Sequence, residues 1–194
     1  MIAAVFDALG TLFDLGRAEG GAELERTLHH AATYTLVGEF APFSELARAV
    51  DAGLAERISQ AEPYGDAGEA LEQLAAAGIP AYVLTNGGAT DTNELLRAGG
   101  LEALVAGLWS VDDVRRFKPD AAPYAHAARA IGVPPEDLAF VSAHAWDVLG
   151  ASSAGFRAVW VERESWSLPA APPQLSAPSL LAAAKLVAAR VTRP

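Results

Sequence analysis

Residues 6–14 read FDALGTLFD and decide the fold, because they place a carboxylate directly after a short apolar strand. The preceding run, IAAVF at residues 2–6, is continuously apolar, which is typical of a parallel strand buried on both faces. Asp7 follows at once, and Gly10 then lets the chain turn away. Ligands bind at the carboxyl ends of strands in open α/β sheets, so Asp7 is a candidate nucleophile or metal ligand. The alternative is an Asp that only caps the turn, and Asp7 therefore needs partners from elsewhere in the chain.

From residue 66 onward, helical and strand patterns alternate. Helices that mostly end at a glycine are predicted at 66–77, 91–98, 120–131 and 147–154. Short apolar strands are predicted at 80–84, 104–109, 138–142 and 158–161. This order predicts an α/β fold with a Rossmann-like core, in which helices flank a central parallel sheet.

Two regions interrupt the alternation. Residues 15–64 have a helical pattern without a clear strand, which predicts a small helical cap inserted after the first strand. The tail at 167–178 is rich in Pro and Ala and is predicted to be irregular, and an Ala-rich surface helix follows at 179–191. The predicted domains are therefore a core of residues 1–14 and 65–194 and a reduced cap of residues 15–64.

Composition narrows the classes of partner. The 194 residues suffice for one core domain with a small insertion, and the absence of cysteine excludes disulfides and thiolate chemistry. Neither a membrane-spanning run nor a signal peptide is visible, so we expect a cytoplasmic protein without membrane contact. The net charge of −10 argues against nucleic acid, although a small anionic substrate is compatible with it if local positive groups bind the anion.

Polar side chains recur where the predicted strands end. They are Asp7 after the first strand, Thr85 and Asn86 after the second, Lys118 before a helix, and Ser142, His144 and Asp147 after the fourth. Each of them alone has an ordinary explanation, such as a turn residue, a helix cap or a solvated charge. Together, at the edge where such sheets bind ligands, they favour an active site.

These groups fit one chemistry. A carboxylate that attacks an electrophilic centre forms a covalent ester and divides one difficult displacement into two easier steps. Lys118 can neutralise Asp7 or a substrate carboxylate, and Thr85 and Asn86 can donate hydrogen bonds to a bound anion. Ser142, His144 and Asp147 can position the water that hydrolyses the ester.

The motifs resemble those of the haloacid dehalogenase superfamily, and more narrowly its L-2-haloacid dehalogenase branch. FDALGTLFD resembles the opening motif and LTNGG at 84–88 the second, while SVDDVRRFKPDAAPY at 110–124 and FVSAHAWDVLGA at 140–151 match in content and spacing. The resemblance implies that Asp7 is the nucleophile. It also implies that the site is lined by Thr11, Thr85, Asn86, Lys118, Tyr124, Ser142 and Asp147. His144 stands where many dehalogenases carry Asn and some relatives carry His.

Departures from the wider superfamily bear on the reaction. The phosphatases of the superfamily carry a second Asp two positions after the nucleophile, where this chain has Leu9, which we expect beside the substrate. They also usually carry a Gly-Asp pair that holds magnesium, where this chain has Ser142 and Ala143. A halide leaves without protonation, so these replacements favour C–halogen cleavage with no metal or other cofactor over phosphoryl transfer.

The cap departs from the pattern of the dehalogenases themselves. In the dehalogenases, a cap arginine helps to bind the substrate and to receive the halide. Here Arg26 lies near the right place, although the alignment sets Leu24 at the matching position, and Arg17 is a second candidate. The missing cap arginine supports one alternative, a weakly active or non-catalytic binding protein. The other alternative is a phosphatase-like hydrolase acting on a small phosphate ester, against which Leu9 and Ala143 argue. Because the family often forms dimers, the resemblance also leaves a homodimer open.

Overall fold

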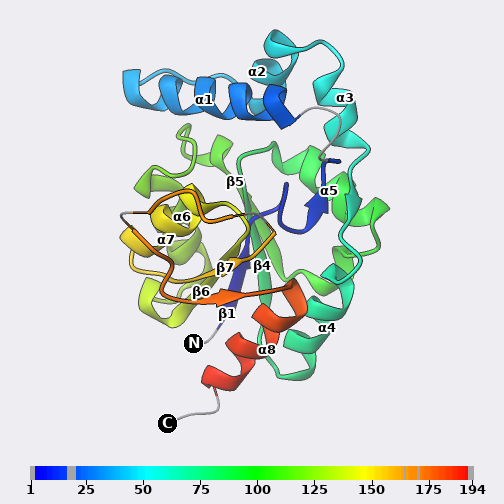
Figure 1. Ribbon diagram of the computed structural model, residues 1–194, viewed down its shortest axis with the longest axis vertical. Coiled ribbons are helices and arrows are strands. Elements are labelled where there is room, and N and C mark those ends of the chain that lie inside the picture. Colours follow the sequence, from blue (N-terminus) through cyan, green and yellow to red (C-terminus); the bar gives the residue numbers. More distant parts are fainter. Residues whose placement is uncertain (1–2, 17–20, 164, 170, 192–194) are drawn as a thin grey trace.

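The computed structural model describes residues 3–16, 21–163, 165–169 and 171–191, and it has the predicted α/β architecture (Figure 1). A parallel sheet of six strands has the order β5-β4-β1-β6-β7-β8. Its strands are β1 (Ala3–Phe6), β4 (Ala81–Thr85), β5 (Gly107–Ser110), β6 (Leu138–Ser142), β7 (Arg157–Val161) and β8 (Ser176–Ala177). The Rossmann-like core with helices on both faces is thus confirmed.

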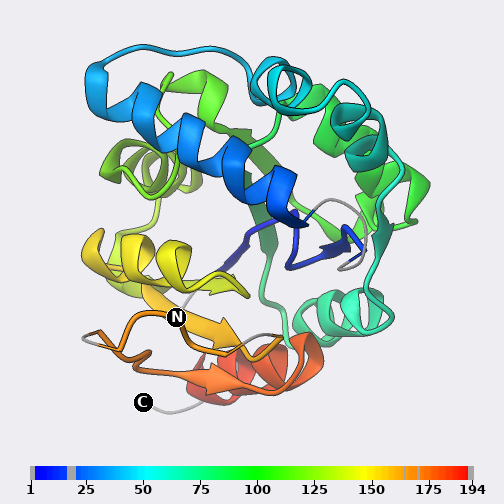
Figure 2. The same cartoon turned by 45° about the horizontal axis from the view of Figure 1, so that its top comes forward.

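Helices on both faces of the sheet explain why its central strands are apolar throughout. One face carries α4 (Ala67–Ala76), α5 (Ala89–Ala98) and α8 (Leu180–Val191), and the other carries α6 (Ala121–Ile131) and α7 (Ala145–Ser153) (Figures 1 and 2). Along β1, Ala4 and Phe6 belong to the first cluster of core residues, whereas Ala3 and Val5 belong to the second. Both sets of side chains are therefore removed from water.

The structure corrects two boundaries. The strand expected at 104–109 is present but begins later, because a short 3-10 helix at Glu102–Leu104 precedes it and β5 starts at Gly107 opposite Tyr82 of β4. The tail at 167–178 includes β8, which pairs with β7 and extends the sheet. The last helix, α8, packs its buried residues against α4 instead of lying only on the surface. Two further 3-10 turns lie at Val111–Asp113 and Pro135–Asp137.

The insertion after β1 consists of α1 (Gly21–Val37), α2 (Phe43–Val50) and α3 (Leu54–Ser59), which lie over the carboxyl edge of the sheet (Figure 1). Two strands that the sequence pattern does not predict frame it. β2 (Phe13–Asp14) and β3 (Glu62–Pro63) pair antiparallel, and two residues are too few for an alternating pattern. None of the described helices is long and apolar enough to cross a membrane.

A close approach between α7 and the loop before α6 gives a first prediction. A Cβ added at Gly150 would lie 2.6 Å from both Pro119 Cβ and Tyr124 Oη. We expect Gly150→Ala to destabilise the protein by roughly 1–3 kcal/mol, because the extra methyl overpacks the core. Urea unfolding measures the change. Gly68→Ala is the control, since its Cβ would make only an ordinary contact at 3.8 Å, and equal effects of the two substitutions would contradict the prediction.

Candidate active site

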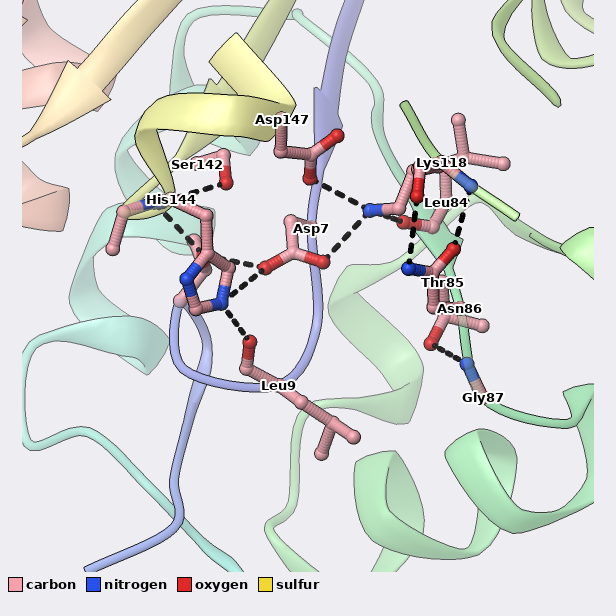
Figure 3. Close-up of polar contacts among 12 residues, drawn as sticks. Asp7, Leu9, Leu84, Thr85, Asn86, Gly87, Lys118, Ser142, His144 and Asp147 are labelled. Atoms are coloured by element: carbon pink, nitrogen blue, oxygen red, sulfur yellow. Dashed lines mark hydrogen bonds and ion pairs between the residues drawn. The ribbon is translucent and has the colours of Figure 1, made fainter. Parts of the chain in front are cut away.

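Asp7 lies at the carboxyl end of β1, almost completely buried (5% exposed), and each of its oxygens accepts a hydrogen bond (Figure 3). Thr11 Oγ1 donates to Oδ2 at 2.7 Å, and Lys118 Nζ donates to Oδ1 at 2.8 Å. The turn at Gly10, with φ of 79°, returns the chain so that Thr11 reaches back to Asp7. The Thr11 hydroxyl also accepts a bond from the Ala143 amide, which fixes the direction of its proton. The turn thus holds a carboxylate in a defined orientation.

Lys118 is the hub of the cluster. Besides Asp7, its ammonium donates to Asp147 Oδ2 at 2.7 Å and to the Leu84 carbonyl at 2.9 Å, which uses all three of its protons. Its backbone amide donates to Asn86 Oδ1 at 2.9 Å. The sheet order explains this convergence, because β1 lies between β4 and β6 and their carboxyl ends share one edge.

The pKa values of the two buried carboxyls are shifted in opposite directions. Burial by itself would raise the pKa of Asp7, but the charges of Lys118 and His144 and the hydrogen bonds from Lys118 and Thr11 lower it below its usual value. Burial raises the pKa of Asp147, and repulsion by Asp7 adds to this despite the Lys118 charge. For Lys118, the two carboxylates outweigh burial and raise its pKa. The cluster therefore favours the ionised form of Asp7 more strongly than that of Asp147.

Three further predicted residues lie around these two carboxylates. Tyr124, which is completely buried, donates from its hydroxyl to Asp147 Oδ1 at 2.5 Å. It therefore contacts the carboxylate oxygen of Asp147 that Lys118 does not bind. His144 Nε2 lies 2.8 Å from the Leu9 carbonyl and 3.6 Å from Asp7 Oδ2. A carbonyl only accepts, so Nε2 carries a proton and donates it to the Leu9 carbonyl, which leaves the ring beside Asp7 without a hydrogen bond to it. Ser142 Oγ accepts a bond from the His144 amide, which orients the start of α7.

Thr85 and Asn86 accept hydrogen bonds in and around the turn that follows β4. Thr85 Oγ1 accepts a hydrogen bond from the Gly87 amide at 2.9 Å, and Asn86 Oδ1 accepts one from the Lys118 amide. Both side chains also line a cavity next to Asp7. The same two residues thus make the contacts of the turn and lie beside the cavity.

The cavity over Asp7 is small, about 20 Å³, and its two sides differ in character. It is lined by Asp7, Leu9, Leu24, Leu28, Phe43, Thr85, Asn86, His144 and Trp146. The core supplies the polar groups, while the inserted helices supply only apolar side chains. Sequence reasoning missed Leu28, Phe43 and Trp146. The four-residue spacing of Leu24 and Leu28 places them on one helix face, a signal that could have found Leu28.

Arg26, the cap residue proposed from the sequence, is placed away from this cavity. Its side chain is 61% exposed and reaches towards Glu23 at 4.0 Å, whereas Leu24 lines the cavity. Arg17 lies outside the described residues. A neighbouring cavity of about 100 Å³ shares Leu24 and His144 with the first and is also lined by Arg163, a cation from the core that the sequence did not single out.

The donor set at this edge does not suit a divalent metal. Within the described part of the chain, no group of three or more His, Asp or Glu side chains is arranged to hold an ion. The Lys118 ammonium lies between the two buried carboxylates, where a magnesium ion would need oxygen ligands in octahedral geometry. The residues therefore do not fit a magnesium site.

Comparisons with known proteins identify similar chains. A family model described as haloacid dehalogenase-like hydrolase matches residues 17–155. The chain is 35% identical to (S)-2-haloacid dehalogenase 1 of Pseudomonas sp. (strain CBS-3), over 83% of this chain and 84% of that protein. It is 33% identical to (S)-2-haloacid dehalogenase 4A of Burkholderia cepacia, over 84% and 83%. The structure of L-2-haloacid dehalogenase from Xanthobacter autotrophicus superposes with a TM-score of 0.88 at 26% identity and covers 100% of both chains.

Proposed function

Because the chain belongs to the haloacid dehalogenase-like hydrolase family, we propose that it cleaves the C–halogen bond of a short 2-haloacid through an ester on Asp7. The observation that carries this proposal is the environment of Asp7. It is an ionised, buried carboxylate fixed by Lys118 and Thr11, and it faces a small cavity with an apolar wall. In the Xanthobacter autotrophicus enzyme, a second structure has chloropropionic acid covalently bound.

In the first step, a carboxylate oxygen of Asp7 attacks C2 of the substrate from the side opposite the halogen. The new C–O bond takes an electron pair from Asp7, and the halide leaves with the pair of the broken bond. No proton is needed, which fits the presence of Leu9 where a general acid would stand. The apolar wall of Leu24 and Leu28 excludes water from the carboxylate and so keeps it reactive.

In the second step, water attacks the carboxyl carbon of Asp7. The ester C–O bond breaks on the Asp7 side, one proton of the water passes to the departing alkoxide oxygen, and the second is released to solvent as Asp7 returns to its carboxylate form. The released hydroxy acid carries one of the original Asp7 oxygens. Thr11 Oγ1 donates to Oδ2, where it can stabilise the charge that develops on that oxygen. The His144 ring lies 3.6 Å from the same oxygen, where it can position the water. Ser142 orients His144 through its amide, and Asp147 holds Lys118 in place.

The remaining predicted residues bind the substrate or support the site. Thr85 and Asn86 line the cavity at the end of β4, where an anion would meet their polar groups, and Leu9 lines it from the turn that follows β1. Tyr124 orients Asp147 and does not line the cavity. We keep residues 1–14 and 65–194 as the core and 15–64 as the cap, a division supported by the β2–β3 pair at its base.

A halide-release assay tests the function. We expect the protein to release chloride from 2-chloropropionate or chloroacetate at the same rate with magnesium and with a chelator. In single-turnover reactions in H₂¹⁸O, the product is expected to carry unlabelled oxygen and Asp7 to take up the label. Magnesium-dependent release of phosphate from a generic ester, or the absence of any turnover, would contradict the proposal.

A further inference from the structure

The segment directly before Lys118 contacts the last turn of α1, across the boundary between the insertion and the core. The Phe117 amide donates a hydrogen bond to Thr35 Oγ1 at 3.0 Å. The Arg116 guanidinium donates from Nη1 to the Thr35 carbonyl. One cap residue thus binds two successive residues of the core loop through two different atoms.

These contacts complete the end of α1. The last turn of a helix leaves carbonyl oxygens without partners in the helix, and the helix dipole favours a cation there. The last turn of α1 has no basic residue of its own. Arg116 supplies that cation from the core, so the contact stabilises the docked position of α1 and orders the loop at the same time.

Phe117 is held by the inserted helices as well. It is 1% exposed, and its ring lies 5.1 Å from the ring of Phe40 and 6.3 Å from that of Phe43. Without the docked insertion, this large side chain would lose its apolar partners and face water. The backbone that leads into Lys118 therefore depends on the cap.

Lys118 follows directly and is fixed from the core side. Its amide donates to Asn86 Oδ1, and its ammonium reaches Asp7 and Asp147 (Figure 3). A chain of three consecutive residues thus joins the C-terminus of α1 to the carboxylate of Asp7. Figure 2 shows α1 lying across the carboxyl edge of the sheet, above this region.

We propose that Thr35 and Arg116 are positioning residues, which hold the Lys118 ammonium against Asp7 when α1 is docked on the core. The proposal rests on the roles of Asp7 and Lys118 in the proposed function. It assigns the cap a part in preparing the nucleophile, in addition to covering the cavity. A displacement of Lys118 by a fraction of an ångström would weaken its bond to Asp7 and slow the displacement of the halide.

Thr35→Val keeps the shape of the side chain and removes the acceptor for the Phe117 amide. We expect kcat for halide release to fall about tenfold while KM stays within about twofold, because alignment of Lys118 and Asp7 is lost. Thr35→Ser, which retains the oxygen, should restore most of the activity. Arg116→Met, which removes the donor to the Thr35 carbonyl, should lower kcat in the same direction and serves if Thr35→Val does not fold.

Thr33→Val is the matched control. Thr33 lies on the same helix, and its hydroxyl donates to the His29 carbonyl within that helix. We expect its kcat and KM to equal those of the wild type. Equal kcat values for Thr35→Val and Thr33→Val, or a Thr35→Ser variant as slow as Thr35→Val, would overturn the proposal.

Amide hydrogen exchange separates this proposal from the proposed function, since it needs no substrate. NMR should show faster exchange at both Phe117 and Lys118 in Thr35→Val than in Thr33→Val. Faster exchange confined to Phe117, with Lys118 unchanged, would overturn the coupling. If the wild type released no halide from any haloacid, the proposed function would fail, while the exchange rates would still decide whether Thr35 positions Lys118.

Discussion

Asp7→Asn is expected to reduce halide release by at least about a thousandfold, because an amide oxygen is a far weaker nucleophile than an ionised carboxylate. The Lys118 and Thr11 hydrogen bonds that lower the pKa of Asp7 keep it ionised at neutral pH. Asn retains an oxygen that can still accept one of these bonds. The substitution therefore removes the chemistry with little change in packing.

The measurement is kcat for chloride release, with the intact mass recorded before and after the assay to exclude deamidation of the new Asn. Asp14→Asn is the control within the same motif. Asp14 is exposed, and its Oδ1 accepts a bond from the Gly16 amide, which Asn can also accept. If Asp7→Asn kept full turnover without deamidating, Asp7 would not be the nucleophile.

The sequence predicted the part of the site that follows from strand order. Asp7 and Lys118 are 111 residues apart, yet they bond, because parallel strands bring their carboxyl ends to one edge. The apolar runs at β1 and β6 are short but uninterrupted, and the predicted strands at 2–6 and 138–142 agree with β1 and β6. Asp7 and Lys118 could thus be predicted as partners because the carboxyl ends of parallel strands lie at one edge of the sheet.

The cavity wall and the cap contacts were not predictable in the same way. Leu28 and Phe43 have the apolar character of ordinary core residues, and only the angle at which α1 and α2 pack places them over Asp7. The contact of Arg116 with the Thr35 carbonyl needs the end of one helix to meet a loop 81 residues away. Tyr124 was expected to line the site, but helix α6 buries it behind Asp147. Whether such a side chain reaches the site depends on the direction in which it points, and spacing in the sequence does not determine that direction.

Lys118→Met is expected to abolish measurable turnover and also to destabilise the protein by roughly 3–5 kcal/mol at pH 7, since it leaves two buried carboxylates without a cation. Both Asp7 and Asp147 lose a charge-assisted hydrogen bond from Nζ, and the Leu84 carbonyl loses its donor as well. Lys185→Met is the matched control. Lys185 is exposed on α8, so its substitution should change the free energy of unfolding by less than about 0.5 kcal/mol.

The pH dependence of this loss identifies its cause. In the wild type, the lowered pKa of Asp7 stabilises the folded state at every pH above the pKa that Asp7 has in the unfolded chain. This contribution is lost as the pH falls through the pKa that Asp7 has in the folded state. In Lys118→Met, burial acts without the ammonium and raises the pKa of both carboxyls, so the folded state binds protons more readily than the unfolded chain. Its stability should then rise as the pH is lowered from 7 towards 5, and the gap to the wild type should narrow. Urea unfolding at both pH values measures this gap, and a gap of constant size would show that the loss comes from packing and not from the uncompensated carboxylates.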